Sequence, residues 1–287
     1  MTFNQIAADR SNLGFAGAPI VDWQFLYQFA AYGDMIFFGC DIQISRRYGT
    51  ENNGAASFVR ANTSHGDMHA AGIYDIGMIE QADPSSAVEE IAATVSRIIA
   101  DLGCMPVLVG CDHTASMAGF LGAVDGKCER LVYVYFDAHF DLGRNWATDD
   151  LLHNGGFVGE ILSQRWASVA VNIGGRGTAT KLHFPDTPHF VSIPASRSRK
   201  DVIATLAGLA GEKIYVSIDA DVLDPSQAPN VSCPEPAGMK ADDLLAYCDW
   251  LAQNCQVIGA DLTEIVPSPC SQASEKLLVQ CLLALKK

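Results

Sequence analysis

Acidic and imidazole side chains stand at alternate positions in two short segments of this chain, and each segment directly follows an apolar run. Side chains two residues apart point the same way in an extended chain, so the polar groups of each segment share one space. The residues concerned are Asp137, His139 and Asp141 in the first segment and Asp219 and Asp221 in the second. If the two segments meet, they form a group of potential metal ligands.

The four carboxylates of these segments would repel one another in a shared space. Each like-charged pair costs about 4 kcal/mol at a separation of about 4 Å and an effective dielectric constant of about 20. Two divalent cations would cancel almost all of this charge. The segments therefore predict a binuclear metal site, and His113, which follows a third apolar run, is a candidate for a further ligand.

The segments that must position these residues alternate between strand and helix patterns. Short, continuously apolar runs predict strands that are covered on both faces, and hence a parallel sheet. These runs are Met35–Gly39, Met105–Gly110, Leu131–Phe136, Ser168–Ile173, His189–Ile193, Lys213–Ile218 and Gln256–Asp261. Helical spacing predicts helices from a capping box at Ser86–Glu89 to Gly103, and over Val202–Leu209, Ala241–Leu251 and Gln272–Leu285.

The alternation continues without a Pro/Gly/Ser-rich linker, which favours one α/β domain of three αβα layers over residues 1–287, with 1–29 as an irregular N-terminal segment. Ligands of open parallel sheets bind beyond the carboxyl ends of the strands. The apolar runs before His113, Asp137 and Asp219 all end in polar residues. We therefore expect these residues to lie along one edge of a mostly parallel sheet.

Composition narrows the class of partner and the compartment. A net charge of −14 disfavours nucleic acid and anionic membranes, and it is compatible with a small cationic substrate. The nine cysteines show no Cys-x-x-Cys spacing, which is typical of free thiols in a reducing compartment. Neither a secretory signal at 1–10 nor an apolar run of about 20 residues is visible, so the sequence predicts a cytoplasmic protein.

Four ordered motifs carry a resemblance to a known family. They are Gly110-Cys111-Asp112-His113-Thr114, Asp137-Ala138-His139-Phe140-Asp141, Ser217-Ile218-Asp219-Ala220-Asp221-Val222-Leu223-Asp224-Pro225 and Pro234-Glu235-Pro236-Ala237-Gly238. From about Met35 to Pro267 the chain resembles the arginase, agmatinase and formiminoglutamase family, the ureohydrolases. The stretch 49–54 is similar to the Gly-Thr loop of this family. The resemblance implies an arginase-like sheet of about eight strands.

The resemblance also implies two Mn²⁺ ions per chain, a choice that fits a carboxylate-rich site with a few imidazoles. By resemblance, one ion is held by His113, Asp137, Asp141 and Asp219 and the other by His139, Asp137, Asp219 and Asp221. A bridging hydroxide would attack the carbon of a guanidino or formimino group. Asp141 would accept the proton, and the products would be an amine with urea or formamide.

Three further residues enter the predicted site by resemblance. Glu264 matches the glutamate that pairs with the amidine or guanidinium nitrogens of the substrate, where a charge-assisted, bidentate contact is expected. His153 matches a histidine that shuttles a proton near the leaving amine. Asn154 stands where the family has glycine, and it completes the substrate-binding set. We expect Cys111 and Arg176 to be structural.

Several alternatives stay open. The motifs are compatible with several substrates, namely free arginine, agmatine, a guanidino acid, formiminoglutamate or an arginine within a peptide. A binuclear phosphoesterase also uses Asp and His clusters, although it needs basic side chains near the metals. A noncatalytic member of the family would lack a metal ligand, whereas all six are present. The resemblance further implies a homo-oligomer, a trimer or a hexamer.

Overall fold

The computed structural model describes residues 13–45, 52–63, 72–80, 83–127, 129–143, 153–177, 189–268 and 273–287. Within these ranges, eight strands form one sheet in the order β2-β1-β3-β8-β7-β4-β5-β6. Each neighbouring pair runs parallel. The strands are β1 (Met35–Cys40), β2 (Ile73–Ile79), β3 (Met105–Val109), β4 (Leu131–Phe136), β5 (Ala167–Ile173), β6 (Phe190–Ile193), β7 (Lys213–Asp219) and β8 (Gln256–Thr263). The predicted parallel sheet is confirmed.

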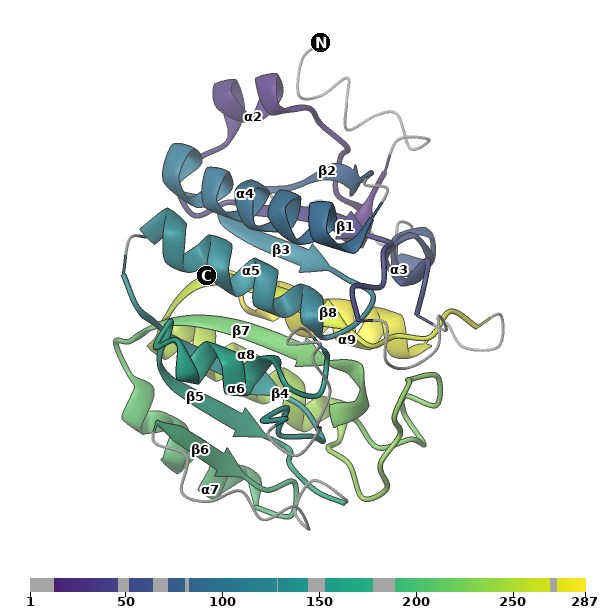
Figure 1. Ribbon diagram of the computed structural model, residues 1–287, viewed down its shortest axis with the longest axis vertical. Helices are drawn as coiled ribbons and strands as arrows, with labels where there is room; N and C mark the ends of the chain where they lie inside the picture. Colours follow the sequence, from purple (N-terminus) through teal and green to yellow (C-terminus); the bar gives the residue numbers. More distant parts are fainter. Residues whose placement is uncertain are drawn as a thin grey trace.

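Helices cover both faces of the sheet and complete the three predicted layers (Figure 1). One face carries α2 (Trp23–Phe29), α4 (Pro84–Leu102), α5 (Thr114–Lys127) and α6 (Phe157–Ser163). The other carries α3 (Ala55–Thr63), α7 (Arg199–Leu206), α8 (Ala241–Asn254) and α9 (Ala273–Ala284). In the part of the chain that the structure describes, no helix combines the length and the apolarity needed to cross a membrane.

The sheet separates two hydrophobic cores, and strand β4 shows how. Val132, Val134 and Phe136 pack into the core under α7 to α9. Tyr133 and Tyr135 pack into the core under α4 to α6. Successive side chains of a strand point to opposite faces, so burial on both faces requires an unbroken apolar run. This is why the central strands could be recognised in the sequence.

The start of helix α4 differs from its prediction. The helix begins at Pro84, and the Asp83 carboxylate caps it by accepting hydrogen bonds from the main-chain nitrogens of Ser85 (3.0 Å) and Ser86 (3.1 Å). The capping box assigned to Ser86–Glu89 is therefore wrong, because an aspartate that precedes proline supplies the cap two residues earlier. The predicted end is confirmed, since Gly103 adopts a left-handed φ of 63°.

Other helices and one strand differ from their predicted positions or were not predicted from the sequence. The segment expected to be irregular contains helix α2, although residues 1–12 lie outside the described part of the chain. Edge strand β2 escaped recognition because its second half is only half-buried and its apolar run is interrupted. Helix α7 begins at Arg199, behind a Ser198 cap, and its α-helical part ends before Leu209. Helices α3, α5 and α6 were not predicted, and of the loop 49–54 only 52–54 are described.

The four central strands end level with one another, which matters for the site. Val109 of β3 pairs with Leu262 of β8, and Asp219 of β7 pairs with Thr263 of β8. Between β3 and β4 the chain skips the places that β8 and β7 later fill. Such a discontinuity leaves room for a ligand beyond the carboxyl ends of the strands.

Candidate metal centre

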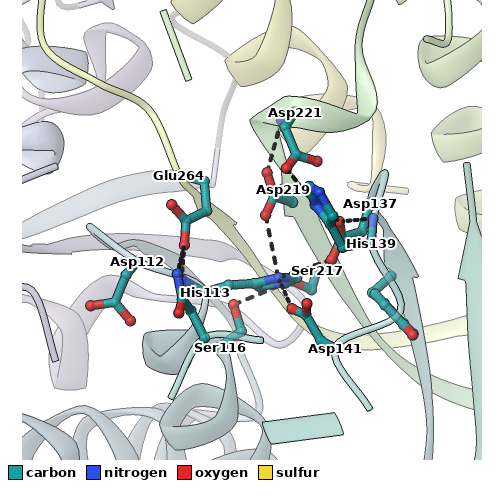
Figure 2. A network of polar contacts seen from close by, with 12 residues as sticks. Asp112, His113, Ser116, Asp137, His139, Asp141, Ser217, Asp219, Asp221 and Glu264 are labelled. Carbon is teal, nitrogen blue, oxygen red and sulfur yellow. Dashed lines mark hydrogen bonds and ion pairs between the residues drawn. The ribbon is translucent and has the colours of Figure 1, made fainter. Parts of the chain in front are cut away.

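Six side chains meet at the carboxyl ends of β3, β4 and β7 (Figure 2). We call them the donor cluster: His113, Asp137, His139, Asp141, Asp219 and Asp221. They contain two groups with metal-ligand geometry, His113–Asp137–Asp219 and Asp137–His139–Asp221, in which all ligand atoms lie within 4.8 Å of one another. Asp137 belongs to both groups. The structure thus brings together all six residues singled out from the sequence.

The two imidazoles organise the carboxylates. His113 Nδ1 lies 3.1 Å from Asp137 Oδ2, 3.0 Å from Asp141 Oδ2 and 3.4 Å from Asp219 Oδ2. His139 Nδ1 lies 2.9 Å from Asp221 Oδ2 and 3.5 Å from Asp137 Oδ1. Two overlapping centres therefore exist, each with one imidazole and at least two carboxylates.

Short main-chain hydrogen bonds fix the carboxylates at the strand ends. Asp137 Oδ1 accepts from the nitrogen of His139 at 2.6 Å, and Asp219 Oδ1 accepts from that of Asp221 at 2.8 Å. Asp221 Oδ1 accepts from the nitrogen of Ala138 at 3.0 Å, which ties the two segments together. Asp141 has a φ of 49°, a conformation that costs free energy and occurs often at functional sites.

The carboxylates are buried against one another, and their pKa values diverge. Burial raises the pKa of Asp219 well above its usual value, and Asp221 and Asp137 raise it further. Burial, then Asp137, raises the pKa of Asp141 to about 7. Burial also acts to raise the pKa of Asp137, but contacts with His113 and His139 outweigh it, and the pKa falls below the usual range. Without cations, the crowded carboxylates therefore retain protons that an isolated aspartate would lose.

The imidazoles respond in the opposite sense. Burial acts to lower the pKa of His113, but Tyr133, Asp137 and Asp141 outweigh it and raise the value well above normal. Burial likewise acts to lower the pKa of His139, and its contacts with Asp137 and Asp221 reverse the sign. Without other cations, the cluster thus draws protons onto both imidazoles.

The donor set fits divalent metal ions better than protons. Asp137 Oδ2 is buried, and among the described residues it accepts no hydrogen bond, although it faces His113 Nδ1. A carboxylate oxygen in that position has a free lone pair for a cation. Carboxylate oxygens with two imidazoles form a donor set for divalent cations, and neither group contains sulfur for a thiolate-preferring metal.

A polar chain behind His113 was missed in the sequence. His113 Nε2 lies 2.9 Å from Ser217 Oγ, and this hydroxyl donates to Asp261 Oδ1 at 2.7 Å. Ser116 of α5 donates to the same oxygen at 2.8 Å. Ser217 and Asp261 are register partners on β7 and β8. The period of two that linked Asp219 to Asp221 also includes Ser217, so the same rule could have found it.

Glu264 follows β8 and lies in a polar cage at the edge of the donor cluster. We call the groups that contact its carboxylate the Glu264 cage: the main-chain nitrogen of His113 and the side chains of Asn52, Asn154 and Ser232. The side chain is 5% exposed, and its φ is 63°. Because His113 directly precedes α5, the helix N-terminus favours a negative charge at this place.

His153 and Asn154 lie in the loop before α6. His153 is 8% exposed and packs against Gly156, where an added Cβ would come within 2.5 Å of its Cε1. Asn154 Nδ2 donates to Glu264 Oε1 at 3.2 Å. The residue that replaces the family's glycine therefore contacts Glu264, the carboxylate that is predicted to bind the substrate. The roles of Asn52 and Ser232 in this contact were not predicted.

Arg176 and Cys111 are structural, as expected. Among the described residues, the Arg176 guanidinium donates to main-chain carbonyl oxygens, including those of Asp221 (2.6 Å) and Glu235 (2.9 Å), and so clamps two loops at the edge of the site. Cys111 is fully buried, and its Sγ faces the carbonyl oxygen of Cys40 at 3.4 Å. Burial raises the pKa of the Cys111 thiol above its usual range, which disfavours a thiolate ligand.

An all-parallel sheet between two helical layers, with clustered Asp and His donors at the strand ends, defines a class of α/β enzymes built for a pair of metal ions. Residues 35–285 match the model of the arginase family, and the chain belongs to this family. Its members are hydrolases that cleave carbon–nitrogen bonds of linear amidines. The predicted family and fold are thus confirmed.

Over the aligned residues, the chain is about one quarter identical to proteins of named activity. It is 26% identical over 226 residues to the N(1)-aminopropylagmatine ureohydrolase of Thermococcus kodakarensis, which is 77% of this chain and 76% of that protein. It is 28% identical over 201 residues to the agmatinase of Halalkalibacterium halodurans, 68% of each chain. The solved structure of a hypothetical agmatinase from Burkholderia thailandensis superimposes with a TM-score of 0.80 at 19% identity, covers 95% of this chain and 88% of that one, and shows the same fold.

Proposed function

We propose that the protein is a manganese-dependent hydrolase that cleaves the carbon–nitrogen bond of a guanidino or formimino group, releasing urea or formamide and an amine. The arrangement that supports this most directly is the pair of donor groups that share Asp137. Their combined carboxylate charge matches two divalent cations. Relatives named as agmatinase and ureohydrolase support the same reaction class.

The residues have separate roles in the proposed reaction. A pair of divalent cations, when bound, would lower the pKa of a water molecule and supply hydroxide near neutral pH. Asp141, whose Oδ2 lies 3.0 Å from His113 Nδ1 at the edge of the donor cluster, would accept a proton and return it near the reacting carbon. His153 would protonate the leaving nitrogen, and Glu264 would orient the amidine through a charge-assisted contact.

A phosphoesterase is a weaker candidate. Phosphate binding near the metals needs cationic side chains whose N–H groups are free to face the ester. Among the described residues, Arg176 is the arginine that lies against the donor cluster, and its N–H groups donate to carbonyl oxygens of the two loops that it clamps. The Glu264 carboxylate beside the donor cluster favours a cationic substrate instead.

The proposal is tested with metal-stripped protein that is reloaded with Mn²⁺, Zn²⁺ or Mg²⁺, with bound metal measured as ions per chain. Each form is assayed against guanidino and formimino compounds, including arginine, agmatine, guanidino acids, formiminoglutamate and an arginine-containing peptide, with urea and formamide quantified separately. Two Mn²⁺ per chain and product from one of these compounds support the proposal. Phosphate release from an ester panel without urea or formamide would overturn it.

A further inference from the structure

Asn172 is a polar residue near the end of the otherwise largely apolar strand β5. Its register partner on β4 is Tyr135, and its side chain is fully buried. Asparagine is depleted in strands, and burial of an amide costs free energy unless hydrogen bonds replace those made with water. The partners of the Asn172 amide therefore indicate what this residue does.

The donor end of the amide reaches the metal-binding segment that follows β4. Asn172 Nδ2 donates to the carbonyl oxygen of His139 at 2.8 Å and to that of Asp137 at 3.3 Å. An amide nitrogen carries two hydrogens, so it serves both acceptors at once. The other end, Oδ1, accepts from the main-chain nitrogen of Gly175 at 3.1 Å. A flipped amide would place its oxygen against two carbonyl oxygens, so these partners fix its orientation.

Two further groups hold the carbonyl oxygens of the same segment. The main-chain nitrogen of Arg176 donates to the carbonyl oxygen of Ala138 at 3.0 Å. The Tyr135 hydroxyl donates to that of Phe140 at 2.7 Å. Together with the two bonds from Asn172, these contacts occupy four consecutive carbonyl oxygens. The main chain that carries two members of the donor cluster therefore cannot shift without breaking hydrogen bonds.

The two imidazoles of the donor cluster are oriented in different ways. We name the two ligand groups after them, the His113 group and the His139 group. The ring of His113 is held at both nitrogens, because Nε2 lies 2.9 Å from Ser217 Oγ while Nδ1 faces carboxylates. The ring of His139 faces Asp221 with Nδ1 and is 26% exposed (Figure 2), and its Nε2 has no hydrogen-bond partner among the described residues. A ring that is held on one side depends on its main chain for orientation.

We propose that Asn172 is a positioning residue for the metal ion that the His139 group would hold. This inference rests on the proposed function. Asn172 fixes the carbonyl oxygen of His139 and so directs Nδ1 of this residue toward Asp221. Asp137, which both groups share, is also tied to β5 by its own nitrogen, which donates to the Ile173 carbonyl oxygen at 3.1 Å. The ion of the His113 group should therefore depend less on Asn172.

Gly175 leaves the space that this arrangement needs. A Cβ added at Gly175 would lie 2.3 Å from Phe140 Cε1 and 2.6 Å from Asn172 Oδ1. Even an alanine would push against both the amide and the segment that the amide holds. A substitution at Gly175 therefore tests the position of Asn172 without changing its chemistry.

The test counts metal ions. Metal-stripped wild-type, Asn172→Ala and Gly175→Ala proteins are equilibrated with Mn²⁺ at a series of free concentrations. Elemental analysis gives the ions bound per chain, and electron paramagnetic resonance distinguishes an exchange-coupled pair from a single ion. We expect the wild-type protein to bind two ions. Each variant should keep the first ion and bind the second about 10- to 100-fold more weakly, as when a group that orients a metal ligand is removed.

The matched control is Asn254→Ala. The Asn254 amide also donates to a main-chain carbonyl oxygen, that of Trp250 at 2.8 Å, but it is exposed on α8. This variant should bind both ions as the wild-type protein does. Excess Mn²⁺ should restore the spectrum of the coupled pair and most of kcat in Asn172→Ala, because only the affinity for one ion has changed.

Several results would overturn the role of Asn172. One is a folded variant, judged by circular dichroism, that binds the second ion with wild-type affinity. Another is a folded variant that loses both ions equally, because the effect would then not be specific to the His139 group. Failure of both variants to fold also overturns it, because Asn172 would then support the fold as a whole.

The wild-type protein separates this inference from the proposed function. Fewer than two bound Mn²⁺ ions in the wild-type protein would overturn both. Two bound ions without urea or formamide from any compound would overturn the proposed hydrolase, and the role of Asn172 would still be decided by the ion counts of the variants. Two ions bound equally well by the wild-type protein and the variants would overturn the role of Asn172 alone.

Discussion

The donor cluster and the Glu264 cage are neighbours at one edge of the sheet, yet their polar groups are satisfied in opposite ways. In the donor cluster, buried carboxylates crowd around two imidazoles, and Asp137 Oδ2 accepts no hydrogen bond from the described residues. In the cage, both oxygens of Glu264 are held by donors of the protein. The first region needs added cations, whereas the second is complete without them.

The difference has a physical origin. Like charges at short distance raise the free energy of the folded chain unless cations or protons compensate them. A single carboxylate at a helix N-terminus, with several hydrogen-bond donors, has no such deficit. The donor cluster should therefore respond to metal and pH, and the cage should respond to substitutions that change hydrogen bonding.

Substitution of Asp137 should have the largest effect, because this residue belongs to both donor groups. Asp137→Ala should lower kcat/KM by at least about 1000-fold, as expected when metal chemistry worth several kcal/mol is lost. Bound Mn²⁺, counted by elemental analysis, should fall below one per chain. Asp249→Ala, an exposed change on α8, is the control. Full activity of the Asp137 variant would contradict the assignment of the cluster.

Glu264→Gln should separate the two regions. Whichever way the new amide turns, its NH₂ group faces donors of the cage, so we expect a loss of about 1 to 3 kcal/mol in unfolding free energy. The activity should fall by about 100-fold because a charged acceptor for the substrate is lost, while the Mn²⁺ content stays unchanged. Glu89→Gln, exposed on α4, serves as the control. Loss of metal in the Glu264 variant would show that the two regions are not separable.

The donor cluster could be predicted from sequence because its signals are local. Asp137, His139 and Asp141 lie within five residues, and the unbroken apolar runs before them and before Asp219 identify buried parallel strands. Since carboxyl ends of parallel strands share an edge, the meeting of the segments follows without further information. Local signals can also mislead. The predicted start of helix α4 was wrong because two such signals, Asp83-Pro84 and Ser86–Glu89, compete within a few residues.

The Glu264 cage could not be predicted, because its members are far apart in sequence and each is ordinary by itself. Asn52 precedes α3, Asn154 precedes α6 and Ser232 lies in the loop after β7. Loop conformations bring them within hydrogen-bond distance of Glu264, and no hydrophobic period encodes a loop conformation. The family resemblance identified Glu264 as a substrate-binding residue and Asn154 as a departure from the family's glycine. It did not predict that the two side chains contact each other.

A smaller effect is expected one step behind the cluster, at Ser217. Its hydroxyl joins His113 Nε2 to Asp261, an arrangement that orients a metal-binding imidazole. Ser217→Ala should weaken Mn²⁺ binding by about 10- to 100-fold, measured by competition with a fluorescent chelator. Ser168→Ala on β5, which removes a contact to the Leu131 carbonyl oxygen, is the control. If both serine variants bind Mn²⁺ as the wild-type protein does, the hydroxyl does not orient His113.

The response to pH should distinguish the two regions without any change in sequence. In metal-free protein, burial and Asp137 raise the pKa of folded Asp141 to about 7, whereas in the unfolded chain this carboxyl has its usual pKa of 3.8. The pKa of His113 in the folded protein is likewise raised well above its usual value of 6.5, so the folded chain keeps this proton to a higher pH. The folded state thus binds more protons than the unfolded state, and its stability falls as pH rises, by about 1.4 kcal/mol per pH unit for each proton.

Bound metal should abolish this slope, because coordination requires the carboxylates and imidazoles in their unprotonated forms. Urea unfolding of the metal-free and the Mn²⁺-loaded protein, between about pH 5 and pH 8, measures the difference. Asp141→Asn should flatten the metal-free curve in part, whereas Ser168→Ala, which changes no titratable group, should keep the wild-type slope. Equal slopes with and without metal would mean that the donor cluster does not release protons when cations bind. The contrast between the two regions would then be lost.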